Sequence, residues 1–333
     1  MCASFAIFNP LLKCALPFTG HFFCLITSVA ASLFICIIYR KECHISSTST
    51  VLHKFLSVLC AVFAVLCTLL LMTQVIRDTC FIVGRGVSTG YYFLLSLSLL
   101  TTSFALCSAG SRSILRFCCI SAPVFMLFTV LCFLPFTAVK GISHDILTFQ
   151  GGGNLLQSAL CGIVSGLMLA SDTAILFYCA KQSITIDLTV TKITVLSVIT
   201  AFFLLLCQNG CVYLIFGRKL TLLLAKPVYA LTKCFKGFDL TEIVPAAGIF
   251  AFIAKCSVYL GFASSSVCSA FGCNTKKQKR TAASIIFLAV PAIYLPFLLS
   301  ENSFYYGSLQ HLIYPLIPLM SLFFIIKHIF EKK

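Results

Sequence analysis

Charged residues are scarce in this sequence. Asp, Glu, Lys and Arg make up 10% of its 333 residues, whereas they make up about a quarter of an ordinary soluble domain. Apolar residues make up 60%, and the mean hydropathy is +1.05. This composition excludes an ordinary soluble domain and predicts a polytopic protein whose main partner is the lipid bilayer. A signal peptide is not predicted, because apolar runs recur along the chain and no basic segment precedes a single short one.

Metal-binding and nucleotide-binding motifs are missing as well. The sequence has no HExxH or Walker motif, and no two cysteines have the CxxC spacing of a metal site. Most of the 20 cysteines lie in apolar runs, where free cysteine behaves as a small packing residue. The six histidines lie at the ends of apolar runs or in loops. We therefore expect no enzyme, no metal site and no cofactor.

Basic residues outnumber acidic residues 24 to 9, which gives a formal net charge of +15. They are spread over short connections between apolar runs rather than gathered in one arm. The excess therefore indicates how the spans are oriented in the membrane, and no nucleic-acid partner is predicted. The side that holds more Lys and Arg is the cytoplasmic one, which predicts a cytoplasmic C-terminus.

Long apolar runs define the expected architecture, since about 20 apolar residues cross a bilayer core. One all-α transmembrane domain is expected over residues 1–333, with a partial N-terminal helix. The nine full spans expected are 20–39, 51–76, 91–109, 117–139, 154–179, 193–216, 241–272, 281–299 and 311–330. Residues 220–236, interrupted at Lys226-Pro227, predict a re-entrant or extracellular helix.

The span 154–179 carries the first candidate site. Gly162, Ser165 and Gly166 weaken the helix, and Asp172 follows two turns later. The glycine pair predicts either a break in the helix or a close-packing face of small residues four apart. Asp172 is costly in a membrane, so it is a candidate to hold an amine, relay a proton or pair with a cation. Alternatively, it caps a short final helix.

Lys255 is the second candidate, because it lies near the middle of the span 241–272. Its ammonium needs a partner there. Glu242 lies roughly 20 Å away along the same helix, so the partner is expected from another span or from free carbonyls. Snorkelling to an interface is the alternative. Tyr259, four residues on, shares the face of Lys255.

Residues 226–271 resemble the B subunit of spore germinant receptors, the spore permease family of the amino acid–polyamine–organocation transporter superfamily. The matching features are a segment with Pro227, an acidic turn at Asp239 and Glu242, and Lys255 about four turns on. The resemblance extends more weakly over nearly the whole chain. It implies ten spans in a five-plus-five inverted repeat, whose first and sixth spans are broken in mid-membrane.

In that numbering, residues 154–179 are the sixth span and 20–39 the second. The chain departs from the family in two respects. It has no tryptophan, whereas the eighth span of the family commonly has one. Only the outer half of the first span is expected, around Asn9 and Pro10, so the resemblance implies a divergent or truncated member.

The resemblance implies a function as well. It predicts a nutrient-sensing subunit in the inner spore membrane that binds a small molecule such as an amino acid and signals to A-type and C-type subunits. A proton-coupled amino-acid permease is the alternative. The expected ligand-binding residues are Asn9, Pro10, Gly162, Ile163, Val164, Ser165, Gly166, Asp172, Lys255 and Tyr259.

Overall fold

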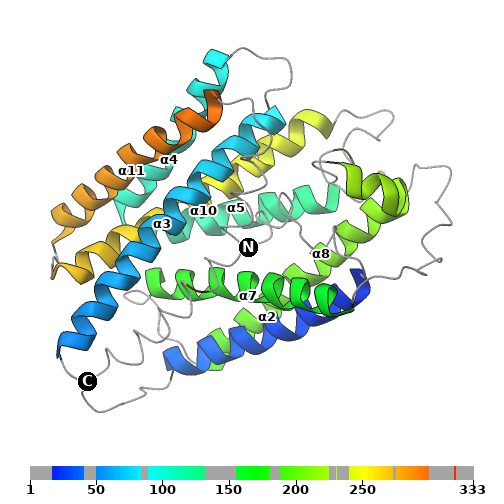
Figure 1. The fold of residues 1–333 in the computed structure, drawn as a ribbon, viewed down its shortest axis with the longest axis horizontal. Helices are drawn as coiled ribbons and strands as arrows, with labels where there is room; N and C mark the ends of the chain where they lie inside the picture. Colours follow the sequence, from blue (N-terminus) through cyan, green and yellow to red (C-terminus); the bar gives the residue numbers. More distant parts are fainter. Residues whose placement is uncertain are drawn as a thin grey trace. The chain divides into compact units, whose positions relative to one another are not determined.

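The computed structural model describes residues 17–40, 50–83, 89–131, 155–180, 188–224, 240–272 and 275–299, with Ala230 and Leu319. Over these residues the fold is helical and contains no strand. The helices are α2 (Pro17–Arg40), α3 (Thr50–Val83), α4 (Thr89–Ala109), α5 (Ser111–Leu131), α7 (Leu155–Ala180), α8 (Leu188–Leu223), α10 (Leu240–Ala270) and α11 (Lys276–Leu299) (Figure 1).

The expected all-helical membrane architecture is confirmed in its coarse form. Each of the first eight predicted spans overlaps one of these helices, whereas 311–330 lies outside the described residues apart from Leu319. Four segments of the described chain are long and apolar enough to cross a bilayer, namely Thr19–Tyr39, Leu155–Tyr178, Leu188–Gly217 and Ile249–Ala270. The chain is therefore a helical membrane protein, and the total of nine full spans stays a prediction.

Several helix boundaries differ from the expected ones, and two of the differences occur at a glycine. Helix α5 begins at Ser111 rather than at residue 117, because Gly110 alone connects it to α4. Helix α8 continues past the expected end at residue 216, but it is kinked at Gly217 (φ 64°, ψ 172°). This kink separates residues 218–223 from the rest of α8, and most of the predicted re-entrant segment after residue 224 lies outside the described residues.

The chain divides into two compact units, each assembled from three separate stretches. Unit 1 contains Met1–Ser32, Ile120–Ala170 and Lys192–Phe252, and unit 2 contains Leu33–Cys119, Ser171–Thr191 and Ile253–Lys333. In unit 2, helices α3, α4 and α11 pack against one another (Figure 1). The largest fully buried side chains of this unit are those of Tyr259, Phe262, Met72, Ile175 and Leu260.

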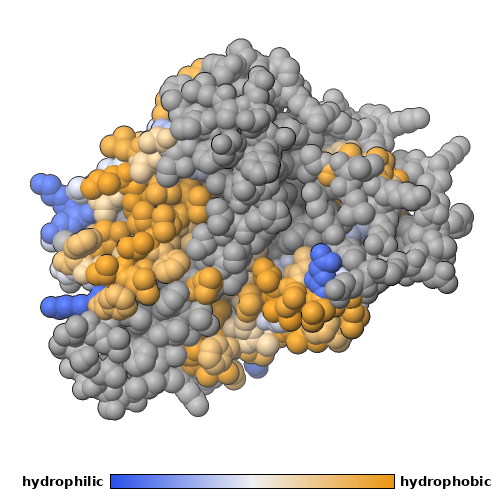
Figure 2. Space-filling view, in the orientation of Figure 1, coloured by the Kyte–Doolittle hydropathy of each residue, from blue (hydrophilic) through white to orange (hydrophobic). Residues whose placement is uncertain are grey.

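Large apolar side chains cover much of the surface of these helices, as expected for helices that face lipid. Figure 2 shows extensive hydrophobic surface on the described part of the chain. The side chains that are more than three-fifths exposed include those of Phe55, Leu94, Ile120, Leu156, Leu196 and Leu288. An aqueous environment would penalise so much exposed apolar area, which supports placement in a bilayer.

Most of the described cysteines are buried or partly buried. All twelve that the structure describes are free thiols. Seven of them are buried, including Cys24, Cys36, Cys60, Cys67 and Cys256. The seven buried cysteines agree with the expected packing role, whereas Cys119 and Cys207 are exposed.

Candidate functional site

Helix α7 is continuous through Gly162 and Gly166, so the predicted break in this span is wrong. The helix runs without interruption over Leu155–Ala180. The backbone groups of Ile163 and Val164 therefore belong to a regular helix and are not freed as ligands. The Ser165 hydroxyl donates to the Cys161 carbonyl of the same helix at 2.8 Å, and its side chain is fully buried.

Close packing against α2 explains the glycines. A Cβ added at Gly162 would collide with the Gly20 carbonyl oxygen, and one added at Gly166 would collide with Thr27 Oγ1 and lie 2.6 Å from the Cys24 carbonyl oxygen. All of these residues belong to unit 1. The packing face of small residues, which was the alternative to a break, is therefore what the structure has. Tertiary packing has overridden the low helix propensity of glycine.

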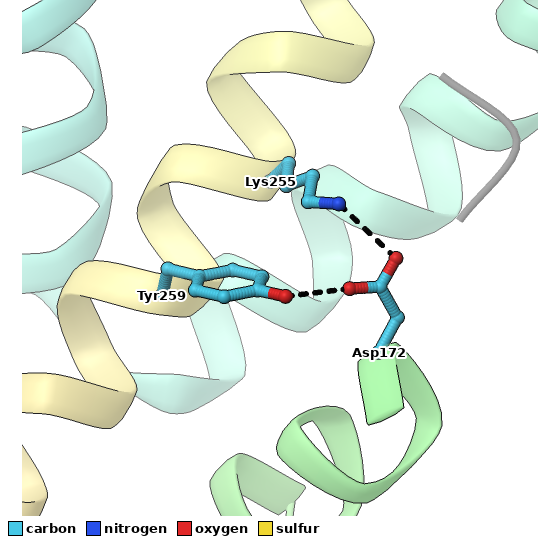
Figure 3. Close-up of polar contacts among 3 residues, drawn as sticks. All are labelled: Asp172, Lys255 and Tyr259. Atoms are coloured by element: carbon cyan, nitrogen blue, oxygen red, sulfur yellow. Dashed lines mark hydrogen bonds and ion pairs between the residues drawn. The ribbon is translucent and has the colours of Figure 1, made fainter. Parts of the chain in front are cut away.

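Asp172, Lys255 and Tyr259 come together in unit 2 and form the candidate site, which we call the charge cluster (Figure 3). Lys255 Nζ lies 3.2 Å from Asp172 Oδ2, and the Tyr259 hydroxyl donates to Asp172 Oδ1 at 2.7 Å. Lys255 Nζ also lies 5.4 Å from the centroid of the Tyr259 ring, within cation–π range. The two oxygens of one carboxylate thus contact two groups of α10.

Burial makes this arrangement more than a surface ion pair. The Lys255 and Asp172 side chains are 9% and 12% exposed, and Tyr259 is 1% exposed. The prediction that Lys255 takes its partner from another span is confirmed, and snorkelling to an interface is excluded. Asp172 lies inside α7 rather than at the start of a new helix, so the alternative of a capping role is wrong.

Neighbouring helices hold the charge cluster in place. Lys255 and Tyr259 are four residues apart and therefore share one face of α10. The Thr68 hydroxyl of α3 donates to the Tyr259 carbonyl at 3.1 Å, which joins α3 to α10 at the level of the phenol. The Tyr178 ring of α7 packs edge-on against Phe262, with centroids 5.2 Å apart. These contacts fix the helices that carry the three polar groups.

The remaining predicted site residues are not part of this cluster. Asn9 and Pro10 lie outside the described residues. Gly162, Ile163, Val164, Ser165 and Gly166 belong to unit 1, whereas the cluster belongs to unit 2. Of the acidic turn, Asp239 lies outside the described residues and Glu242 lies in the first turn of α10. Among the described residues no group of His, Cys, Asp and Glu side chains could hold a metal ion.

Sequence reasoning missed a polar contact in unit 1. His21 is buried in α2, and its Nε2 lies 2.7 Å from Asn209 Nδ2 of α8. The neighbouring Gln208 is buried too, and its Nε2 has no hydrogen-bond partner within the described part of the chain. Two adjacent amides inside an apolar run were the available signal, because such side chains commonly bond across helices in membranes.

The replacement Asn209→Leu is expected to destabilise the fold by roughly 1 kcal/mol, because interhelical hydrogen bonds in membranes contribute about that much. Thermal unfolding in detergent micelles measures the effect. Ser197→Ala is the matched control on α8, since this exposed hydroxyl bonds only locally, to the Ile193 carbonyl. Equal melting temperatures for the two variants would show that the His21 contact does not stabilise the helix pair.

Comparison with models of known protein families gives no match, and comparison with curated proteins gives none either.

Proposed function

We propose that this membrane protein binds a small zwitterionic nutrient, such as an amino acid, at the charge cluster of Asp172, Lys255 and Tyr259. It acts as a B-type subunit of a spore germinant receptor in the inner spore membrane, with its C-terminus in the cytoplasm and A-type and C-type subunits as partners. The buried contact between Asp172 and Lys255, 3.2 Å long, carries the proposal. The resemblance of residues 226–271 to that family supports the assignment to this class.

Charge balance favours a zwitterionic ligand. The α-ammonium of an amino acid would replace Lys255 on the Asp172 carboxylate, and the α-carboxylate would bind the released Lys255 ammonium. Each buried charge would then keep a partner of opposite sign, which a neutral or singly charged ligand does not provide. The Tyr259 hydroxyl, 2.7 Å from Asp172 Oδ1, would hold the carboxylate during this exchange.

The continuous helix α7 changes how recognition works. A broken helix presents free backbone N–H and C=O groups to its ligand, but the backbone of residues 162–166 is in a regular helix. Side chains must therefore provide the contacts. The proposed contact set is smaller than the sequence predicts and consists of Asp172, Lys255 and Tyr259.

A binding experiment tests this function. Radiolabelled common amino acids are applied one at a time to the purified protein in lipid nanodiscs. At least one is expected to bind saturably, and Asp172→Asn is expected to weaken that binding at least tenfold. Ser98→Ala, on an exposed position of α4, is the control and should bind as the unmodified protein does. Binding that is absent for all amino acids, or unaffected by Asp172→Asn, would contradict the proposal.

A proton-coupled amino-acid permease is the second candidate function. A carboxylate that contacts both an ammonium and a phenol inside the membrane is suited to exchanging a proton with a substrate. Proteoliposomes separate the two functions. Uptake driven by a pH gradient, lost in Asp172→Asn, would favour the permease, whereas binding without uptake would favour the receptor subunit.

A further inference from the structure

The corner between α4 and α5 is a tight, well-defined turn. Helix α4 ends at Ala109, α5 begins at Ser111, and Gly110 between them has φ +106°. Only glycine adopts this backbone conformation readily. The Gly110 N–H donates to the Cys107 carbonyl at 3.1 Å, and the Ser113 N–H donates to the Gly110 carbonyl at 3.0 Å. Arg112 and Arg116 are exposed in the first two turns of α5, directly after this turn.

The start of α11 carries four more basic residues in five positions, namely Lys276, Lys277, Lys279 and Arg280. Thr275 and Gln278 form a capping box here. The Gln278 N–H donates to Thr275 Oγ1 at 3.3 Å, and the Thr275 N–H donates to Gln278 Oε1 at 3.1 Å. Cations in a first helical turn oppose the helix dipole. The four cations therefore face an unfavourable dipole, which an anion bound outside the helix would offset.

Arg280 joins these two basic segments. Its Nε donates to the Ser108 carbonyl in the last turn of α4 at 3.1 Å. We call the resulting patch of Arg112, Arg116, Lys276, Lys277, Lys279 and Arg280 the basic corner; all of it belongs to unit 2. The sequence has no Asp or Glu from residue 79 to 144 or from residue 243 to 300. Neither segment can therefore neutralise its own cations.

Exposed apolar side chains lie further along α11 and along α4. On α11, Ile285 and Leu288 are 64% and 67% exposed, and both lie within about three and a half turns of Lys276. On α4, Leu94 and Leu97 are exposed as well. Figure 2 shows hydrophilic surface beside hydrophobic surface at the end where α11 begins in Figure 1. A ligand for the corner must thus be anionic where it meets the cations and apolar where it meets these helices.

We propose that the basic corner binds the headgroup of an anionic phospholipid. The phosphodiester would lie among Arg112, Lys276 and Lys277, and the acyl chains would lie along the exposed apolar side chains of α4 and α11. Basic clusters at the membrane surface attract anionic lipids, and this attraction adds up over several cations. Neither a nucleic acid nor an acidic protein would make use of the apolar surface next to the cations, so a lipid fits the patch better.

Native mass spectrometry of the full chain tests this site. The protein is released from nanodiscs that contain equal amounts of phosphatidylglycerol and phosphatidylcholine, and the lipids that stay bound are counted. Unmodified protein is expected to retain phosphatidylglycerol in clear excess. The double variant Lys276→Gln/Lys277→Gln is expected to lose at least fivefold of that excess, and adding Arg112→Gln should abolish it.

Two matched variants make the result specific. Lys54→Gln/Lys192→Gln removes the same number of exposed cations from α3 and α8 and should retain the lipid. Lys276→Arg/Lys277→Arg keeps the charge and should also retain it, while circular dichroism verifies that every variant stays helical. Equal lipid loss in the two Gln double variants would overturn the proposal. Phosphatidylglycerol retention that is unchanged in Lys276→Gln/Lys277→Gln, while this variant loses binding of an acidic peptide or of single-stranded DNA, would also overturn it.

Discussion

Replacing Asp172 by Asn is expected to lower the free energy of unfolding by roughly 3–5 kcal/mol, the range seen when one partner of a buried ion pair is removed. The reason is that Lys255, 9% exposed, would lose its carboxylate partner in a site that water reaches poorly. Chemical unfolding in bicelles, followed by circular dichroism, measures the change.

The double variant Asp172→Asn/Lys255→Met is expected to recover most of this loss. Removing both charges eliminates the uncompensated ion, and replacing buried pairs with apolar groups is often neutral or stabilising. Tyr259→Phe is a milder comparison and should cost about 1 kcal/mol, the usual contribution of one hydrogen bond. A double variant that is as unstable as Asp172→Asn alone would mean that the charge cluster does not couple α7 to α10.

The double variant distinguishes a structural role of the ion pair from a role in ligand binding. If the pair exists only to hold helices together, an equally stable uncharged protein should still bind its ligand. If the pair is the recognition site, the protein should fold normally and bind no amino acid. An ion pair that can be exchanged for apolar groups without loss of stability is more readily explained by a ligand than by folding.

The sequence contained the components of the charge cluster but not their arrangement. Lys255 needed a partner, and the length of one helix excluded Glu242, so a second span was predictable. Asp172 was a candidate because a carboxylate in an apolar run is expensive. That these two residues pair with each other depends on which helices neighbour one another, and periodicity within a single span does not specify this.

The glycines of α7 show where sequence reasoning had no means of deciding. A break and a close helix contact both require Gly162 and Gly166 at this spacing, and the residues that separate the two cases belong to another helix. Gly20, Cys24 and Thr27 approach so closely that no side chain fits. His21 lies at the end of an apolar run, and its partner Asn209 belongs to another helix, so the run alone does not predict their contact.

Gly166→Ala is expected to destabilise the protein by about 1–3 kcal/mol, the usual range for overpacking in a well-packed contact. The new Cβ would meet Thr27 Oγ1, the Cys24 carbonyl oxygen and, at 3.0 Å, the Ser28 backbone nitrogen. Two of these three atoms are backbone, so α2 would have to move. Gly162→Ala should behave in the same way, because its Cβ would approach the backbone of Gly20. Thermal unfolding in detergent measures both variants.

Gly210→Ala is the matched control, because a Cβ at this position of α8 meets nothing within 4 Å. Alanine there should stabilise the helix by about 0.5–1 kcal/mol, since it loses less backbone entropy than glycine. The variants should thus shift the melting temperature in opposite directions. If Gly166→Ala raised it as Gly210→Ala does, α7 would not be held against α2. If alanine at residue 166 stabilised the protein, the stability of α7 would depend on its helix propensity rather than on packing against α2. A helix of that kind could unwind around a ligand.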